Sequence, residues 1–337
     1  MKIGALNLIT DVNGVLVGNA ANEQIKTGVT VLTAEKPMIA GVDVMGGAPG
    51  SRETDCLASE NLVSDVDAIV LAGGSAFGLD AASGVTDALA EQNRGFKVGP
   101  ATVPIVPAAI IFDLINGGNK QWQNNPYGEL GRQALAEAST QFELGTAGAG
   151  TGATTANLKG GLGSASVVLS SGFTVGALVV ANPHGSPVVP GSAHFWAAPF
   201  EVENEFGALG PASQMQALHE PENEKLTAFE AKSNTCIAIV ATDAELDKPQ
   251  ATRMAVAAQD GLARSIVPSH TLFDGDLIFA VSTRKKPVES AQSTMVQMEL
   301  GHAAALCVAR AVARAVYLAK PKDNDTMPTW QCRFGQN

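Results

Sequence analysis

The sequence Ser-Asn-Thr-Cys-Ile-Ala-Ile-Val-Ala at positions 233–241 combines three candidate nucleophiles with an apolar strand. Ser233 and Thr235 carry hydroxyl groups, Cys236 carries a thiol, and the apolar, β-branched residues that follow are typical of a buried strand. Since side chains alternate between the two faces of a strand, Thr235 and Cys236 cannot both point into one site. Thr235 would share a face with Ile237 and Ile239.

Taken alone, this segment is most simply a turn that leads into a core strand, with Cys236 as a core filler. The stretch before it, residues 201–233, is rich in glutamate and polar residues. Such a stretch is usually a solvated linker or a surface helix. Its position matters more than its composition, because an exposed segment there would allow a cut before Thr235 without loss of the core.

Further from this segment, the same kind of apolar run predicts strands, while apolar residues three and four positions apart predict helices. The strands are expected at 29–32, 68–71, 165–169, 176–181, 235–241 and 277–281. The helices are expected at 78–91, 130–138, 248–263 and 290–318. Some strands are adjacent and others are separated by helices. A sheet-on-sheet sandwich enclosed by helices therefore competes with a doubly wound sheet.

Asp274 and Asp276 stand two residues apart at the entry to the predicted strand at 277–281, so their carboxyl groups could share one face. Two carboxylates that close cannot both ionise cheaply in a site of low dielectric, and a raised pKa suits proton transfer. The alternatives are a solvated Asp-Gly turn and a cation site, although two carboxylates alone make a poor metal cage.

A glycine-rich run covers residues 145–161 and includes Gly148, Gly150 and Lys159. Its spacing is not that of the phosphate-binding P-loop, so we expect no nucleotide and no cofactor here. Glycines also allow backbone amides to approach a substrate oxygen. We therefore expect Gly148 and Gly150 to line a pocket. If the chain were cut before Thr235, a nearby lysine such as Lys159 would lower the pKa of the new terminal amine by like-charge repulsion.

The overall composition indicates a globular protein, with 45% hydrophobic residues and a net charge of -11. That charge argues against a nucleic-acid partner, since phosphate binding needs clustered Lys and Arg. We expect neither a signal peptide nor a membrane span, because the apolar runs are short or carry charges. The four cysteines lack CxxC pairing and metal-ligand spacing, which predicts reduced thiols, no metal and a cytoplasmic location.

Ordered motifs extend through nearly the whole chain. They are TDVNG at 10–14, GVDVMGGAPG at 41–50, GGSAFGL at 73–79, VPIVPAAIIFD at 103–113, NP at 182–183, NT at 234–235, ATDA at 241–244 and DGD at 274–276. With these motifs the chain resembles the DmpA/NylC family, which comprises DmpA-type aminopeptidases, β-aminopeptidases and the nylon-oligomer hydrolase NylC.

The resemblance implies an α+β fold, a four-layer αββα sandwich, in which the precursor cuts itself and the two fragments stay associated. Residues 1–337 would be one hydrolase domain, cut between Asn234 and Thr235 into fragments 1–234 and 235–337. Thr235 would be the nucleophile, as in the nylon-hydrolase branch, where aminopeptidase members have Ser. We expect the cut units to form a homo-oligomer.

The resemblance also assigns the other site residues. Asp274 and Asp276 match the two aspartates of the threonine branch, where the other branch carries Ser and Glu. Lys159 and Asn182 match polar residues that line the site and help to stabilise the oxyanion. The site tyrosine of characterised members falls on Phe112, which has no hydroxyl to donate. The expected substrates are small amides or peptides with a free amine, including ω-amino-acid oligomers.

Two alternatives from other classes remain at this point. The ornithine acetyltransferases have a related fold and also cut themselves before a threonine, but they transfer the acyl group to an amino acid. A binding or structural protein could keep the fold without ever being cut.

Overall fold

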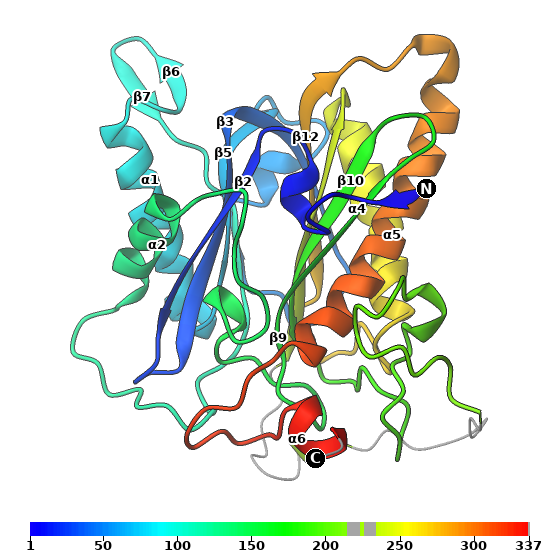
Figure 1. Ribbon diagram of the computed structural model, residues 1–337. Helices are drawn as coiled ribbons and strands as arrows, with labels where there is room; N and C mark the ends of the chain where they lie inside the picture. The colour runs from blue at the N-terminus through cyan, green and yellow to red at the C-terminus, as the bar shows by residue number, and fades with distance from the viewer. Residues whose placement is uncertain (214–222, 226–233, 336–337) are drawn as a thin grey trace.

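The computed structural model describes residues 1–213, 223–225 and 234–335, which form four layers (Figure 1). Two β layers lie in the middle. The helices α1 (Ala81–Glu91) and α2 (Tyr127–Ala136) cover one of them, and α4 (Lys248–Ala263) and α5 (Ser293–Tyr317) cover the other. This arrangement confirms the predicted αββα sandwich, and the competing prediction of a doubly wound sheet was wrong.

The first β layer contains the antiparallel pair β2 (Val15–Asn22) and β3 (Thr27–Val44), followed by β5 (Asp65–Ala72), β8 (Ala108–Ile110) and the short β4 (Ser51–Arg52). The second layer runs in the order β1 (Lys2–Ile3), β9 (Gly161–Val168), β10 (Thr174–Asn182), β11 (Thr235–Ala244) and β12 (Leu277–Lys286).

The long strand β3 joins the two layers. Its first half pairs with β2 and β5, its last residues pair with β12, and its register with β5 shifts between Thr33 and Met38. Glu35, Lys36 and Pro37 lie in this shift and are exposed. Pro37 cannot donate a ladder hydrogen bond, and proline is tolerated where a strand is interrupted by a bulge. The sequence therefore predicted only 29–32 of this strand.

Three apolar clusters fill the three spaces between the four layers. Ile237, Ile239 and Phe279 belong to the cluster between the two sheets. Cys236 and Ala238 belong instead to the cluster under α4 and α5. A third cluster packs α1 and α2 on the first β layer. The alternation predicted for the strand that begins at Thr235 is thus confirmed.

The strands β11 and β12 occupy the centre of the second layer. They are parallel to each other, and they are flanked by β10 on one side and by the end of β3 on the other. Every residue of β11 is buried, as expected for a strand covered on both faces. The connection between the two strands is α4, whose first turn is capped by the Asp247 carboxylate bonded to the backbone N–H of Gln250.

Small residues allow α5 to approach the second β layer closely. A side chain at Gly163 would collide with the backbone oxygen of Ala311, and one at Gly161 with that of Ala315. Ala303, Ala304 and Ala311 of α5 belong to the cluster between the helices and this sheet. The 35 glycines of the chain are consistent with layers in such close contact.

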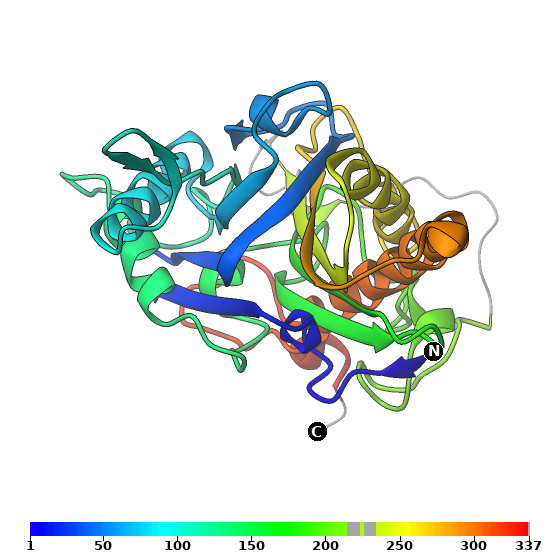
Figure 2. The ribbon, with the colours of Figure 1, turned by 90° about the horizontal axis from the view of Figure 1, so that it is seen from above.

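The hairpin of β6 (Phe96–Val98) and β7 (Ala101–Val103) lies outside the sandwich, next to α1 (Figure 2), and the short helix α6 (Trp330–Phe334) lies below it near the C-terminus (Figure 1). Residues 214–222 and 226–233 of the polar stretch 201–233 lie outside the described residues, whereas residues 201–213 are exposed or half-buried except for the buried Phe206. Within the described part of the chain, no helix combines the length and apolarity needed to cross a membrane.

Candidate active site

Thr235 is the first residue of β11 and is 2% exposed. On the neighbouring strand β10, the antiparallel register places Asn182 opposite it. Asn182 is likewise buried and is the last residue of its strand. The structure therefore brings together two of the residues that the sequence predicted for the site, at one end of the second β layer.

Two hydrogen-bond donors contact the carbonyl oxygen of Asn234, directly before Thr235. The hydroxyl of Thr235 donates a hydrogen bond to the carbonyl oxygen of Asn234. The backbone N–H of Gly275 donates to the same oxygen at 2.9 Å. A side chain at Gly275 would lie 2.9 Å from the Thr235 Oγ1 and 2.6 Å from the carbonyl oxygen of Ala48. Glycine at this position thus leaves room for the threonine hydroxyl.

Asp274 and Asp276 lie just before β12, and both are almost completely buried. One oxygen of Asp274 accepts from the backbone N–H of His184 at 2.9 Å, and the other from the N–H and hydroxyl of Thr271. Asp276 accepts from the N–H of Cys236 at 2.7 Å and from the N–H of His270 at 3.1 Å. Each of the four carboxylate oxygens thus binds at least one backbone N–H.

These bonds tie Asp276 to the backbone directly after Thr235, at Cys236, and Asp274 to the backbone that follows β10, at His184. A bond from Asp274 to Thr235 is not among the hydrogen bonds of the described residues in this intact chain. Burial raises the pKa of Asp274, and the nearby charge of Asp276 raises it further. The predicted proximity of the two carboxyl groups is therefore present.

Two histidines that the sequence analysis did not single out belong to the same cluster. The ring Nδ1 of His270 lies 3.0 Å from Asp276, although the two groups are not aligned for a hydrogen bond. Burial alone would lower the pKa of His270, but the contact with Asp276 outweighs it and raises the pKa. Burial lowers the pKa of His184. In the sequence, the signal that could have identified them is that His184 follows Asn182 closely and His270 precedes Asp274 closely.

The side-chain amide of Asn182 connects three segments. Its oxygen accepts from the backbone N–H of Thr154 at 2.9 Å, and its nitrogen donates to the backbone carbonyl of Phe112 at 3.2 Å. Phe112 thus reaches the site through its backbone, and its side chain is half-buried. The amide nitrogen that would stabilise an oxyanion is engaged by Phe112 in the intact chain.

Lys159 is buried at the end of the glycine-rich run, but its ammonium group binds Asp325. The Nζ to carboxylate distance is 2.6 Å, and Lys26 binds the other oxygen of the same carboxylate at 2.7 Å. Burial lowers the pKa of Lys159, although Asp325 opposes this effect. Lys159 is linked to Asn182 only indirectly, through the backbone pairing of residues 154 and 159.

Lys225 occupies the position beside Asn182 and was missed by the sequence analysis. It is 5% exposed, and its Nζ donates to the carbonyl oxygen of Thr154 at 2.9 Å and to the amide oxygen of Asn182 at 3.3 Å. Burial lowers its pKa to about 7, even though Asp274 and Asp113 act to raise it. Nothing in the acidic stretch around Lys225 marks it as a buried residue.

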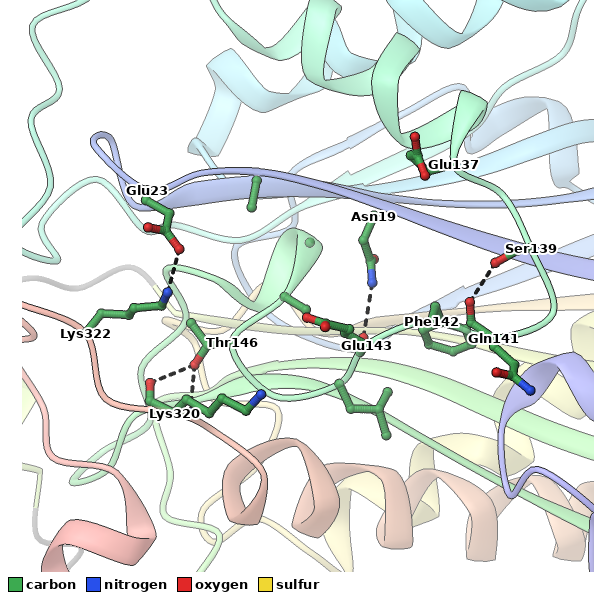
Figure 3. Close-up of a pocket in the computed structure, with 14 residues that line it drawn as sticks. Asn19, Glu23, Glu137, Ser139, Gln141, Phe142, Glu143, Thr146, Lys320 and Lys322 are labelled. Carbon is green, nitrogen blue, oxygen red and sulfur yellow. Dashed lines mark hydrogen bonds and ion pairs between the residues drawn. The ribbon is translucent and has the colours of Figure 1, made fainter.

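The glycines of the predicted pocket lie in the short 3-10 helix Gly148–Gly150, which contacts β2 and β3. Gly150 packs against the backbone of Leu162. Gly148 lines a surface cavity of about 430 Å³ whose wall includes Glu23 and Lys322, which point toward each other (Figure 3). A second cavity of about 190 Å³ shares Glu23 and Lys322 with the first and reaches Lys159.

Comparison with known proteins agrees with this architecture. Residues 7–326 match the model of peptidase family S58. An uncharacterized aminopeptidase of Mycobacterium tuberculosis (strain ATCC 25618 / H37Rv) is 41% identical over 345 residues, which is 98% of each chain. The 6-aminohexanoate-oligomer endohydrolase of Kocuria sp. (strain KY2) is 30% identical over 290 residues, 83% of this chain and 76% of that protein.

Among solved structures, a Burkholderia sp. beta-aminopeptidase is similar over 100% of this chain and 96% of its own, with a TM-score of 0.70 and 25% identity. The family match spans almost the entire sandwich, from before β2 to beyond α5. The resemblance seen in the sequence motifs is thereby confirmed. The chain belongs to peptidase family S58 and is a hydrolase of peptide or amide bonds.

Proposed function

We propose that the chain cuts itself between Asn234 and Thr235, and that Thr235 then hydrolyses small amides or peptides bearing a free amine. The observation that carries this proposal is the contact between the Thr235 hydroxyl and the Asn234 carbonyl, with the N–H of Gly275 on the same oxygen. Mass spectrometry of the purified protein tests the first step. We expect two fragments, residues 1–234 and 235–337, that copurify under native conditions.

In the self-cleavage step, the Thr235 Oγ1 attacks the carbonyl carbon of Asn234. The C–N bond breaks as the hydroxyl proton passes to the departing nitrogen, which leaves an ester and a free α-amine. Water then opens the ester to a carboxylate on Asn234 and restores the threonine hydroxyl. The N–H of Gly275 points at the oxygen that becomes negative in this reaction. Such a donor contributes roughly 2.7 to 4 kcal/mol in other enzymes.

In turnover, the new amine of Thr235 acts as the base for its own hydroxyl, since an ordinary α-amino group has a pKa near ~7.7 to 8.0. The hydroxyl attacks the substrate amide, the leaving amine takes the proton, and water hydrolyses the acyl-enzyme. Asn182 would donate to the tetrahedral oxyanion once its amide nitrogen leaves Phe112. Asp274 and Asp276 hold the backbone around the nucleophile and would bind the new amine.

Small substrates fit this site better than folded proteins. Thr235 is 2% exposed at the end of a central strand. The two surface cavities of about 430 and 190 Å³ beside Glu23 and Lys322 are not lined by Thr235, so they do not widen the access to it. The relatives named above are aminopeptidases and a 6-aminohexanoate-oligomer endohydrolase. We propose free-amine amides as substrates, with ω-amino-acid oligomers among them.

Chelators are expected to leave both self-cleavage and turnover unchanged. The two aspartates are the groups that could be mistaken for cation ligands, but each of their oxygens accepts from a backbone N–H. A hard cation would have to displace these bonds, and two carboxylates make a poor cage. The measurement is fragment formation and amide hydrolysis with and without EDTA. Loss of activity that a divalent ion restores would assign the pair to a metal.

A free amine on the substrate is expected to be required. We predict that an aminoacyl amide or an aminohexanoate dimer is hydrolysed and that its N-acetyl derivative is hydrolysed at least about tenfold more slowly, because a site that hydrogen-bonds a polar group rejects analogues lacking it. Chromatography of the released product measures both rates. Equal rates for the two, or rapid digestion of unfolded casein, would contradict the proposed substrate class.

A further inference from the structure

The buried ammonium group of Lys225 is not used by the chemistry above. It lies beside the predicted nucleophile. Its two acceptors are the Thr154 carbonyl and the Asn182 amide oxygen, and no carboxylate of the described residues is in hydrogen-bond contact with it. We propose that these two oxygens form the subsite for the primary ammonium group of the substrate, and that Lys225 fills this subsite in the intact chain. The inference rests on the proposed function and deepens it.

The chemistry of the subsite suits an ammonium group. A primary ammonium has three N–H donors, and the distances from Nζ are 2.9 Å to the Thr154 oxygen and 3.3 Å to the Asn182 oxygen. The carboxylates of Asp274 and Asp113 add negative potential without direct contact. An N-acylated amine has one N–H and an added carbonyl, so it would leave an acceptor unsatisfied in a buried site.

The position of the subsite relates it to the reaction. Asn182 is the strand partner of Thr235, so an amine bound to its side-chain oxygen lies next to the strand end that carries the nucleophile. The nearby carboxylates of Asp274 and Asp276 already accept hydrogen bonds from backbone N–H groups. The Thr154 carbonyl and the Asn182 oxygen are the acceptors that a cation contacts in this part of the described chain.

The neighbouring lysines do not fill this role. Lys159 and Lys26 are each held by one oxygen of the Asp325 carboxylate, at 2.6 and 2.7 Å. Lys225 is held by uncharged oxygens, and burial lowers its pKa to about 7. A substrate amine and Lys225 would compete for the same two oxygens.

The test uses the intact chain, so that it does not depend on amide hydrolysis. The parent protein carries Thr235→Ala alone and keeps Lys225. The second protein adds Lys225→Ala, which empties the subsite, and the third adds Lys225→Met, which fills the same space without charge. The probe is n-butylammonium, and the neutral control probe is N-butylacetamide. Calorimetry and thermal unfolding are measured for all three proteins.

We expect n-butylammonium to bind the Lys225→Ala protein at least about tenfold more tightly than either the Lys225 parent or the Lys225→Met protein, a difference of about 1.4 kcal/mol. N-butylacetamide should bind none of them. If Lys225→Ala is poorly folded, n-butylammonium should raise its unfolding temperature and leave that of Lys225→Met unchanged. Equal binding to all three proteins, or equal binding of both probes, overturns the subsite. Failure of self-cleavage would appear separately, in the mass of the unmodified protein.

Discussion

Replacing Thr235 with alanine is expected to leave one intact chain of 337 residues without measurable amidase activity. The hydroxyl that contacts the Asn234 carbonyl would be gone, so the acyl shift could not begin. Because the same group is the proposed nucleophile in turnover, the loss in kcat should be on the order of 10⁶-fold, as in other enzymes whose nucleophile is removed. Denaturing electrophoresis and an amide hydrolysis assay give the two readouts.

The matched control is Cys236→Ala, on the adjacent residue and the opposite face of β11. The thiol of Cys236 packs under α4 and α5, and burial raises its pKa well above the ordinary value, so it is a poor nucleophile. This variant should still be cut between Asn234 and Thr235. If Thr235→Ala is cut, or if the unmodified protein is active as a single chain, the nucleophile is another residue.

Replacing Asp276 with asparagine is expected to slow self-cleavage and turnover by on the order of 10²- to 10⁴-fold. The carboxylate accepts from the N–H of Cys236 on one oxygen and from the N–H of His270 on the other. An amide would direct its NH2 group at one of these donors, which would shift the backbone beside Thr235. It would also remove the charge that helps to raise the pKa of Asp274. Time courses of fragment formation measure the effect.

Asp243→Asn supplies the control for this experiment. Asp243 lies on β11 and is as buried as Asp276; it accepts from the N–H of Thr174 at 2.8 Å and pairs with Lys286 at 2.8 Å. It lies toward the far end of β11 from Thr235. We expect Asp243→Asn to lower the stability while leaving self-cleavage intact. Similar cleavage rates in the two variants would mean that Asp276 has only a structural role.

Much of the fold could be predicted because its central strands are continuously apolar. The runs at 235–241 and 277–281 are the cores of β11 and β12, and the helix at 248–263 begins and ends where predicted. β2 was missed since Gly18, Asn19 and Asn22 interrupt its apolar pattern. The second half of β3 was missed because Pro37 ends the local strand signal, whereas pairing with β12 continues the strand.

The candidate site was predictable only where one local segment carries the signal. Strand entry and spacing singled out Thr235 and the two aspartates as candidates, but their roles, like that of Asn182, came from the family resemblance. The register of β10 brings Asn182 to Thr235. The position of Lys225 beside Asn182 was not predicted, because no local pattern in the acidic stretch around it indicates a buried residue. The ion pair of Lys159 with Asp325 joins residues far apart in the sequence and was equally invisible.

The central position of β11 and β12 affects how the protein can refold. Both strands follow the proposed cut, while β10 and β3 on either side precede it. An intact chain refolds in a unimolecular reaction. After the cut, refolding needs an encounter of two chains, and residues 1–234 alone would present two open strand edges that invite aggregation. The lifetime of the cut enzyme would then be set by its unfolding rate and not by its equilibrium stability.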